Sequence, residues 1–265
     1  MLSVRNLSAS FHTRAGIVRA VRNVSFDVAP GETLGIVGES GSGKSVTCYS
    51  IMGLIPMPPG RIESGSAMLD GTDLLRCPEK ELRAIRGKRI SMIFQDSMTS
   101  LNPVKTIGKQ LDEAFIVHHS CDKNEAKNRS IEMLTKVGIP SPEKRYGEYP
   151  HQLSGGMRQR VGIAMAMTFN PELLLADEPT SALDVTTQAQ IVRQMMELRD
   201  DFHTGIIIVT HNIGVAAYMA DQLIVMQNGK VVDQGTRDEV MNHPTSDYTK
   251  KLLAAVPEME GRRFV

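Results

Sequence analysis

The sequence predicts an α/β fold with a mostly parallel central sheet, an antiparallel β subdomain and an inserted helical subdomain. Three observations support this prediction. Residues 1–37 alternate apolar and polar positions, residues 97–169 have a helical texture, and short apolar runs alternate with helical patterns after residue 172. Short apolar strands separated by helices are typical of a buried parallel sheet with helices on both faces.

The amino-terminal region has the pattern of β-strands. Apolar residues alternate with polar ones, and Pro30-Gly31 marks a turn. This alternation predicts a meander of short strands. A further strand is expected at Gly65–Leu69, before the turn signal Asp70-Gly71.

The rest of the chain predicts helices and then a regular alternation. Ile131, Leu134 and Val137 recur at helical spacing, and Gly138 followed by Pro140 ends that helix. The alternation that follows predicts, in order, strand Leu173–Asp177, helix Val185–Asp201, strand Gly205–Thr210, helix Ile213–Ala220 and strand Leu223–Met226. We expect one domain over residues 1–265, with its core and antiparallel β subdomain at about 1–95 and 170–235, a helical subdomain at about 96–169 and a short extension at about 236–265.

The composition narrows the class of protein. Basic and acidic residues both number 30, so no excess charge predicts binding to nucleic acid or to lipid. The cysteines Cys48, Cys77 and Cys121 lack C-x-x-C spacing, which argues against a disulfide framework, a zinc site and an iron–sulfur cluster. No signal pattern or membrane-spanning apolar run is present. The sequence predicts a soluble cytosolic chain that would serve a membrane only by docking onto a protein that crosses it.

The stretch GESGSGKS fits G-x-x-x-x-G-K-[ST] through Gly38, Gly43, Lys44 and Ser45. It follows an apolar strand candidate and opens a helix candidate that extends to about Leu54. Glycines allow successive backbone N–H groups to surround an anion, and the helix N-terminus adds partial positive charge. We expect Lys44 to be exposed on this loop and to reach the β- and γ-phosphates, with the Ser45 hydroxyl on Mg²⁺. The predicted nucleotide-binding residues are Gly38, Glu39, Ser40, Gly41, Ser42, Gly43, Lys44, Ser45 and Val46.

Two carboxylates end the apolar run LLLADE. The carboxyl ends of parallel strands are where such sheets bind ligands. Asp177 is therefore predicted to hold Mg²⁺, directly or through water, and Glu178 to polarise the water that attacks the γ-phosphate. A solvated acidic strand end is the alternative, but the nearby phosphate loop favours the functional interpretation.

Two further polar residues end apolar strands. Gln95 follows Ile90–Phe94 and is predicted to contact the metal or the attacking water, although an isolated glutamine there would be a surface residue. His211 ends the run GIIIVTH. Beside two carboxylates it predicts a γ-phosphate contact, whereas a lone histidine would be a turn residue.

The motif LSGGM, residues 153–157, precedes a helical pattern. Ser154 is expected to be an N-cap, and the glycines Gly155 and Gly156 leave N–H groups at a helix start open to an anion. One nucleotide does not need two phosphate cradles from one subunit. We therefore predict two chains arranged head to tail, with each nucleotide between Lys44 of one and Ser154 of the other. An ordinary helix cap is the alternative, and this motif alone does not exclude it.

Together these motifs resemble the nucleotide-binding domains of ABC transporters over nearly the whole chain. GESGSGKS, Gln95, LSGGM, LLLADE, SALD and His211 follow in that family's order and spacing. They resemble its Walker A loop, Q-loop, signature, Walker B strand with catalytic glutamate, D-loop and switch histidine. The resemblance implies that Glu178, His211 and Gln95 are catalytic and that Ser45, Gln95 and Asp177 contact Mg²⁺. It implies that Phe11, which is otherwise a core residue, stacks on adenine. It also implies a signature formed by Leu153, Ser154, Gly155, Gly156 and Met157, and a D-loop formed by Ser181, Ala182, Leu183 and Asp184.

Within the family, QDSMTSLNP, ADEPTSALDVTTQAQI and HPTSDYTKKLLAAVP resemble the branch that serves peptide and nickel importers. Longer peptide-importer subunits continue past AAVP into a cysteine-rich segment that resembles an iron–sulfur site. Here PEMEGRRFV follows, without cysteine, so we expect no cluster and leave peptide and nickel open. Asn212 stands where many relatives have aspartate, and little consequence is expected.

The resemblance implies an ATP-hydrolysing, Mg²⁺-dependent subunit that energises an importer for peptides or nickel and other metal chelates. The implied partners are a second ABC ATPase subunit (a paralogue, or a copy in a homodimer), two transmembrane permease subunits contacted around residues 97–109, and indirectly a solute-binding protein, with no nucleic acid. The implied location is the cytoplasmic face of a prokaryotic inner or plasma membrane, with peripheral attachment through the permease. An exporter ATPase with separately encoded membrane domains is the alternative. A non-transport ATPase of DNA repair or translation is the third class, but those usually carry two cassettes, zinc cysteines or coiled-coil arms.

Overall fold

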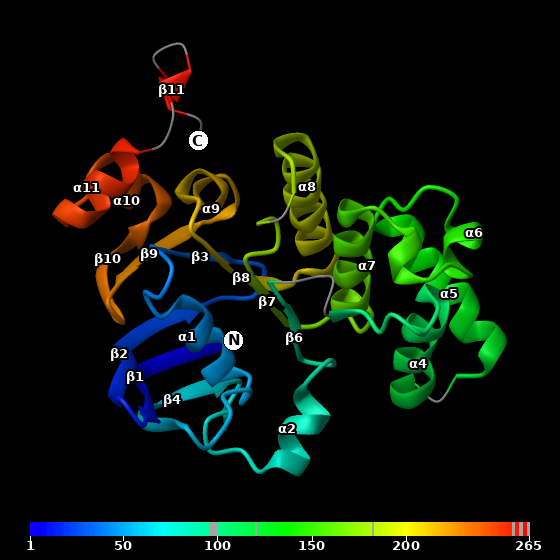
Figure 1. Cartoon of the computed structure of the whole chain (residues 1–265), viewed down its shortest axis with the longest axis horizontal. Helices are drawn as coiled ribbons and strands as arrows, with labels where there is room; N and C mark the ends of the chain where they lie inside the picture. The colour runs from blue at the N-terminus through cyan, green and yellow to red at the C-terminus, as the bar shows by residue number, and fades with distance from the viewer. Residues whose placement is uncertain (96–99, 120, 182, 256–257, 260–261, 264–265) are drawn as a thin grey trace.

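A computed structural model describes residues 1–95, 100–119, 121–181, 183–255, 258–259 and 262–263. Figure 1 shows two main sheets with helix α1 (Lys44–Ile51) between them, a group of helices on one side of the molecule, and α11 (Asp247–Ala254) at the far side. A small hairpin of β11 (Glu258–Met259) and β12 (Arg262–Arg263) follows α11. The parallel sheet therefore has helices on both of its faces.

The antiparallel sheet has the order β2-β1-β4-β5. Its strands are β1 (Leu2–Thr13), β2 (Gly16–Val28), β4 (Gly60–Leu69) and β5 (Thr72–Asp73). The prediction of short strands was wrong here, because β1 and β2 have 12 and 13 residues. The predicted start at Gly65 was also wrong. Gly65 takes φ 107° inside β4, beside a register shift in the pairing with β1, so it marks a bulge within a longer strand.

The second sheet has the order β10-β9-β3-β8-β7-β6. All of its neighbours are parallel except the edge pair β9 and β10. This confirms the predicted mostly parallel sheet, and its strands are β3 (Thr33–Val37), β6 (Ile90–Ile93), β7 (Leu173–Asp177), β8 (Gly205–Thr210), β9 (Gln222–Gln227) and β10 (Lys230–Thr236). The sequence did not predict β10, whose half-exposed edge position leaves no continuous apolar run.

Side chains of the parallel strands alternate between two hydrophobic clusters. In β7, Leu173 and Leu175 belong to the cluster that contains α1, whereas Leu174 and Ala176 belong to the cluster of the helical region. Strand β8 (Gly205–Thr210) alternates in the same way. Because both faces of these strands are buried, consecutive positions are apolar up to the polar residues Asp177 and Thr210 at the strand ends, and the period-2 pattern of a half-exposed strand is absent.

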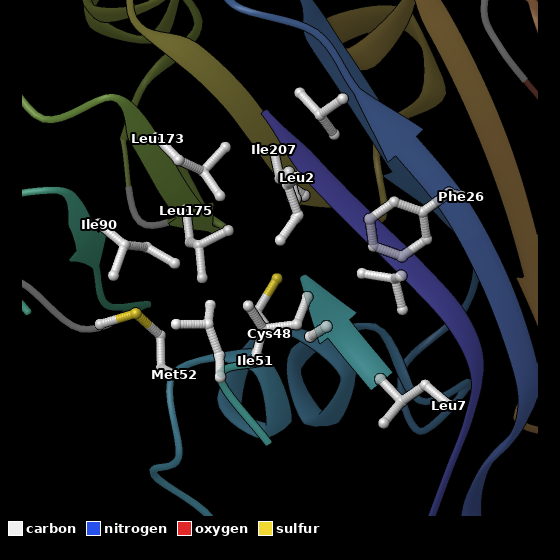
Figure 2. Packing of buried hydrophobic residues seen from close by; sticks show 14 of the residues in the cluster. Leu2, Leu7, Phe26, Cys48, Ile51, Met52, Ile90, Leu173, Leu175 and Ile207 are labelled. Carbon is white, nitrogen blue, oxygen red and sulfur yellow. The ribbon is translucent and has the colours of Figure 1, made fainter. Parts of the chain in front are cut away.

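Helix α1 is packed between the two sheets. Figure 2 shows apolar side chains from three layers meeting around it: Leu2, Leu7 and Phe26 from the antiparallel sheet, Cys48, Ile51 and Met52 from α1 and its end, and Ile90, Leu173, Leu175 and Ile207 from the parallel sheet. This packing fixes the start of α1 next to the carboxyl ends of the parallel strands. The predicted end near Leu54 was three residues late, because α1 ends at Ile51.

The helical region lies beyond β6, at the green side of Figure 1. Its elements are α4 (Ile107–His119), α5 (Lys123–Lys136), α6 (Pro142–Tyr146), a 3₁₀ turn (Pro150–Gln152) and α7 (Gly155–Met167). The predicted stop after Val137 is confirmed, since Gly138 takes φ 65° directly after the C-cap of α5. The predicted permease-contacting segment, residues 97–109, lies partly outside the described residues.

The remaining helices are α2 (Glu79–Ile85), α8 (Val185–Phe202), α9 (Ile213–Met219) and α10 (Arg237–Asn242). Helices α9, α10 and α11 share a hydrophobic cluster with β3 and β9, formed by residues such as Val37, Leu223, Val240 and Leu253. The sequence did not predict α2, α10 or α11. Within the ranges that the structure describes, no helix is both long and apolar enough to cross a membrane.

Candidate functional site: a phosphate loop at the carboxyl edge of the sheet

The loop between β3 and α1 depends on two glycines. Gly38 has φ 150°, and a Cβ there would lie 2.2 Å from the carbonyl oxygen of Met226. Gly43 has φ 104°, and a Cβ there would lie 2.2 Å from the carbonyl oxygen of Ala20. Any larger residue at either position would force backbone apart. The glycines therefore set the loop's path around the N-terminus of α1.

Lys44 is the first residue of α1 and is 4% exposed. The expectation of an exposed lysine was wrong. Its Nζ donates to the carbonyl oxygens of Gly38 and Glu39, both at 2.8 Å, so the loop encloses the ammonium group. Burial lowers the pKa of Lys44, and the carboxylates of Glu178 and Asp177 oppose that shift.

Asp177 ends β7 and is fully buried. The Ser45 hydroxyl donates to its Oδ1 at 2.8 Å, and its Oδ2 is buried without a hydrogen-bond partner. Burial raises the pKa of Asp177, the charge of Glu178 adds to this, and the hydroxyls of Ser45 and Tyr49 oppose it. A carboxylate and a hydroxyl are the oxygen ligands that Mg²⁺ takes in phosphate sites. The unpaired Oδ2 therefore fits a bound cation.

Glu178 and His211 form a pair across two neighbouring strand ends. Glu178 has φ 48°, in the left-handed region, and its N–H donates to the carbonyl of Val209 at 2.8 Å. The Nδ1 of His211 lies 2.8 Å from Oε2 of Glu178. A non-glycine residue in this region is strained, and such residues gather at functional sites. The glutamate is 13% exposed and the histidine 59%, so the pair faces the surface of the site.

Gln95 and Phe11 are two further residues that the sequence predicts to contact the nucleotide, its metal or the attacking water. Gln95 is exposed just past β6, at the same edge of the sheet as Asp177. Phe11 of β1 is half-buried and packs against the core cluster, and a Cβ on Gly60 would lie 3.3 Å from its ring. Core packing therefore accounts for the position of Phe11, and its contact with adenine stays a prediction.

The LSGGM segment forms the start of α7. Ser154 is the N-cap, and its hydroxyl accepts from the N–H of Met157 at 3.3 Å, which confirms the predicted cap. Leu153 is buried beneath it. Gly156 packs against α8 so closely that a Cβ would lie 2.7 Å from Thr187 Cγ2. This close approach requires a residue without a side chain, while Ser154 itself is exposed.

The SALD segment joins the site to α8. The N–H of Ser181 donates to the carbonyl of Glu178 at 3.2 Å. Asp184 caps α8 by accepting a backbone N–H at 2.9 Å. Leu183 packs against the cluster of the helical region, and Ala182 lies outside the described residues. The segment therefore begins at the carboxylate pair and ends beside the start of α7.

The structure brings most of the predicted residues together at one edge of the sheet. Lys44, Ser45, Asp177, Glu178 and His211 are connected by the contacts above. The Ser154 segment is separate, since α7 and α1 lie on opposite sides of β6 and β7 in Figure 1.

Two tyrosines near the site were missed. Tyr49 lies one helical turn after Ser45, and this spacing alone predicts a position near Asp177. Burial and the Asp177 carboxylate raise the pKa of Tyr49 to about 12. Tyr248 of α11 contacts the phosphate loop from 209 residues away in sequence. No local pattern could have found that contact.

A glycine-shaped loop around a lysine, a helix N-terminus and a carboxylate pair at the edge of a parallel sheet define a nucleoside-triphosphate hydrolase of the phosphate-loop class. Residues 21–181 match the family described as ABC transporter, and the chain belongs to this family. It is an ATPase.

Similar curated proteins extend the match to nearly the whole chain. The oligopeptide transport ATP-binding protein OppD of Bacillus subtilis is 53% identical over 261 residues, which are 98% of this chain and 73% of that protein. The dipeptide transport ATP-binding protein DppD of the same organism is 50% identical over 98% of this chain and 78% of its own length. OppD of Haemophilus influenzae is 49% identical over 98% of this chain and 80% of its own length.

Solved structures agree with the fold. A dimeric structure of the ATP-binding cassette MJ0796 in a post-hydrolysis state, bound to ADP and Pi, is 29% identical with a TM-score of 0.80. The match covers 89% of this chain and 99% of that one. The cbiO1 cassette from Clostridium perfringens, part of the transporter complex cbiONQ, has a TM-score of 0.75 at 27% identity over 90% of this chain and 89% of its own.

Asp177→Asn tests the cation site. We expect Mg²⁺-dependent ATP turnover to fall by about 100-fold, because the amide keeps the shape but loses the charge that would hold the ion. The thermal midpoint should not fall, because the substitution removes a negative charge whose burial is unfavourable. Turnover at different Mg²⁺ concentrations, together with a melting curve, measures both effects. Wild-type turnover at every Mg²⁺ concentration would contradict the assignment.

No iron or zinc is expected in the purified protein, which metal analysis checks.

Proposed function

We propose that this chain is the ATPase subunit of a peptide importer. The observation that carries the proposal is about 50% identity, over 98% of the chain, to proteins named for oligopeptide and dipeptide transport. The cluster of Lys44, Asp177, Glu178 and His211 supports it, because an energy-coupling subunit must itself turn over ATP.

Each group at the site has a role in this proposal. The loop N–H groups from Gly38 to Val46 and the ammonium of Lys44 bind the β- and γ-phosphates. Glu178 orients and polarises the attacking water, and His211 holds that carboxylate through Nδ1 and contacts the γ-phosphate. Gln95 contacts the metal or the water and senses the γ-phosphate. Phe11 stacks on the adenine.

A magnesium ion would be held by Ser45 and Asp177, with Gln95 beside them. When bound it would neutralise charge on the phosphates. Asp177 fits this role because its Oδ2 is buried without a partner while its Oδ1 accepts from Ser45. The hydroxyl contact keeps the Asp177 carboxylate aimed at the phosphate loop.

The active assembly in this proposal is a dimer of cassettes. Ser154, with its neighbours Leu153, Gly155, Gly156 and Met157, contacts the γ-phosphate bound by Lys44 of the partner. The segment Ser181–Asp184 lies between the two sites. The separation of α7 from α1 supports this arrangement, as do solved relatives described as dimeric cassettes. We expect the partner to be a paralogue, with a homodimer as the alternative.

The remaining partners are membrane proteins. We expect two transmembrane permease subunits to bind the helical side around residues 97–109, and a solute-binding protein to act through them. In this proposal the chain binds peripherally, through the permease, at the cytoplasmic face of a prokaryotic inner or plasma membrane. The transported solute is selected by those partners.

The test is co-expression with the neighbouring permease and cassette genes, followed by reconstitution in proteoliposomes. ATP turnover should rise about tenfold or more when the binding protein delivers an oligopeptide, and labelled peptide should move to the side of the membrane that carries the cassettes. Stimulation of ATP turnover by a nickel chelate instead of a peptide would identify the chelate as the transported substrate. If solute moves away from the side that carries the cassettes, and does so without a binding protein, the chain serves an exporter and not an importer. Co-purification with ribosomes or DNA would overturn a role in transport.

A further inference from the structure

One peptide group connects the carboxyl-terminal helix α11 to Lys44. The N–H of Glu39 donates to the hydroxyl of Tyr248 at 2.9 Å. The carbonyl of the same peptide group, which belongs to Gly38, accepts from Lys44 Nζ at 2.8 Å. The two bonds leave this peptide in opposite directions, as its trans geometry requires. Tyr248 therefore contacts the unit that holds the lysine.

The backbone at Gly38 is closely packed. Gly38 lies against the carbonyl of Met226, where a Cβ would meet that oxygen at 2.2 Å, and close to the Ser42 hydroxyl. Rotation of the Gly38–Glu39 peptide would remove its carbonyl from Lys44. The hydrogen bond from the N–H of Glu39 to the hydroxyl of Tyr248 opposes that rotation.

Helix α11 is itself fixed to the sheet at its first turn. Asp233 of β10 accepts from the N–H and hydroxyl of Thr245, at 2.9 and 3.0 Å, and from the N–H of Ser246 at 3.2 Å. Burial opposes ionisation, but these bonds lower the pKa of Asp233 below its ordinary value. Ser246 then caps α11 by accepting from the N–H of Tyr248. The tyrosine therefore extends from a rigid base.

Tyr248 is half-buried and packs against the cluster of α9, α10 and β9, to which Leu252 and Leu253 also belong. Burial raises the pKa of Tyr248, so the hydroxyl stays neutral at physiological pH. A neutral hydroxyl can accept the hydrogen bond from the N–H of Glu39 without placing a further negative charge beside the phosphates.

We propose that Tyr248 is a positioning residue for ATP binding. Through the Gly38–Glu39 peptide it holds Lys44 and the start of the phosphate loop in the arrangement that binds phosphate. The inference rests on the proposed role of Lys44. The hydrogen bond that the N–H of Glu39 donates to Tyr248 also polarises the carbonyl of the same peptide, which strengthens the contact of that carbonyl with the ammonium of Lys44. The segment after β10 is then part of the nucleotide site.

Tyr248→Phe removes only the hydroxyl and keeps the ring in its cluster. We expect the Kd for ATP to rise about 3- to 10-fold, the effect of one hydrogen bond, with kcat at saturating ATP within about twofold of wild type. Glu178 and His211 are untouched, which is why kcat is preserved. Amide exchange of the peptides that cover residues 36–45 should become faster in the nucleotide-free protein.

Leu252→Ala is the matched control, because it removes packing from the same cluster without touching the loop. It should lower the thermal midpoint while leaving the ATP Kd unchanged. The inference is overturned if Tyr248→Phe binds ATP as wild type does, or if Leu252→Ala weakens binding as much. Lys44→Ala separates the two proposals. If it binds ATP normally, the proposed site fails; if it does not bind and Tyr248→Phe is normal, only this inference fails.

Discussion

Glu178→Gln is expected to arrest the ATPase with nucleotide bound. The amide keeps the size of the side chain and an oxygen for His211 Nδ1, but it loses the charge that polarises the attacking water. Turnover should fall by about 1,000-fold, while ATP stays bound between Lys44 of one chain and Ser154 of its partner. Size-exclusion chromatography with ATP should therefore detect a trapped dimer, tightest with the neighbouring cassette protein.

Ser154→Arg is the control for the composite site. The Ser154 side chain is exposed, so the substitution should leave the fold intact while the longer side chain blocks the phosphate position in the partner. If Glu178→Gln remains monomeric with every partner, the two-site mechanism is wrong. The same holds if Ser154→Arg preserves both dimerisation and turnover. A strong homodimer that ignores the paralogue would remove only the expected heterodimer.

Lys44→Ala should reduce ATP affinity by about 100-fold, because a charge-assisted contact to phosphate is lost. The structure adds a second effect. The carbonyls of Gly38 and Glu39 lose their donor, so the thermal midpoint of the nucleotide-free protein should fall by a few degrees. Isothermal titration with ATP and a melting curve measure the two effects separately.

Lys80→Ala, on an exposed face of α2, is the matched lysine control and should change neither measurement. Circular dichroism should show that both variants keep the wild-type secondary structure. Nucleotide binding by Lys44→Ala at wild-type affinity would remove the lysine from the site.

The sequence predicted the parallel sheet well because both faces of its strands are buried. Leu173–Asp177 and Gly205–Thr210 are apolar runs that end in a polar residue, and the structure has strands at the same residues. The antiparallel strands were predicted too short, since Gly65 resembles a strand boundary but is a bulge. Edge strand β10 and the helices after it carry weaker patterns, because part of each is exposed.

The candidate site was predictable where a motif also fixes local geometry. The phosphate loop, the strand-end residues Asp177 and His211, and the N-cap Ser154 belong to this kind. The burial of Lys44 was not predictable, because it depends on carbonyls that turn inward only when the loop is folded. The contact of Tyr248 depends on tertiary packing between chain segments far apart in sequence.

The alternation along β7 has a consequence for how this strand can vary. Asp177 has the same parity as Leu173 and Leu175, the residues that face α1, which is why its carboxylate meets Ser45. Insertion or deletion of one residue between Leu175 and Asp177 would turn the carboxylate toward the helical region while the leucines keep their layers, so that the carboxylate would no longer meet Ser45. The spacing along β7 is therefore constrained by the site. Its apolar residues can be exchanged for other apolar residues, but residues cannot be added or removed.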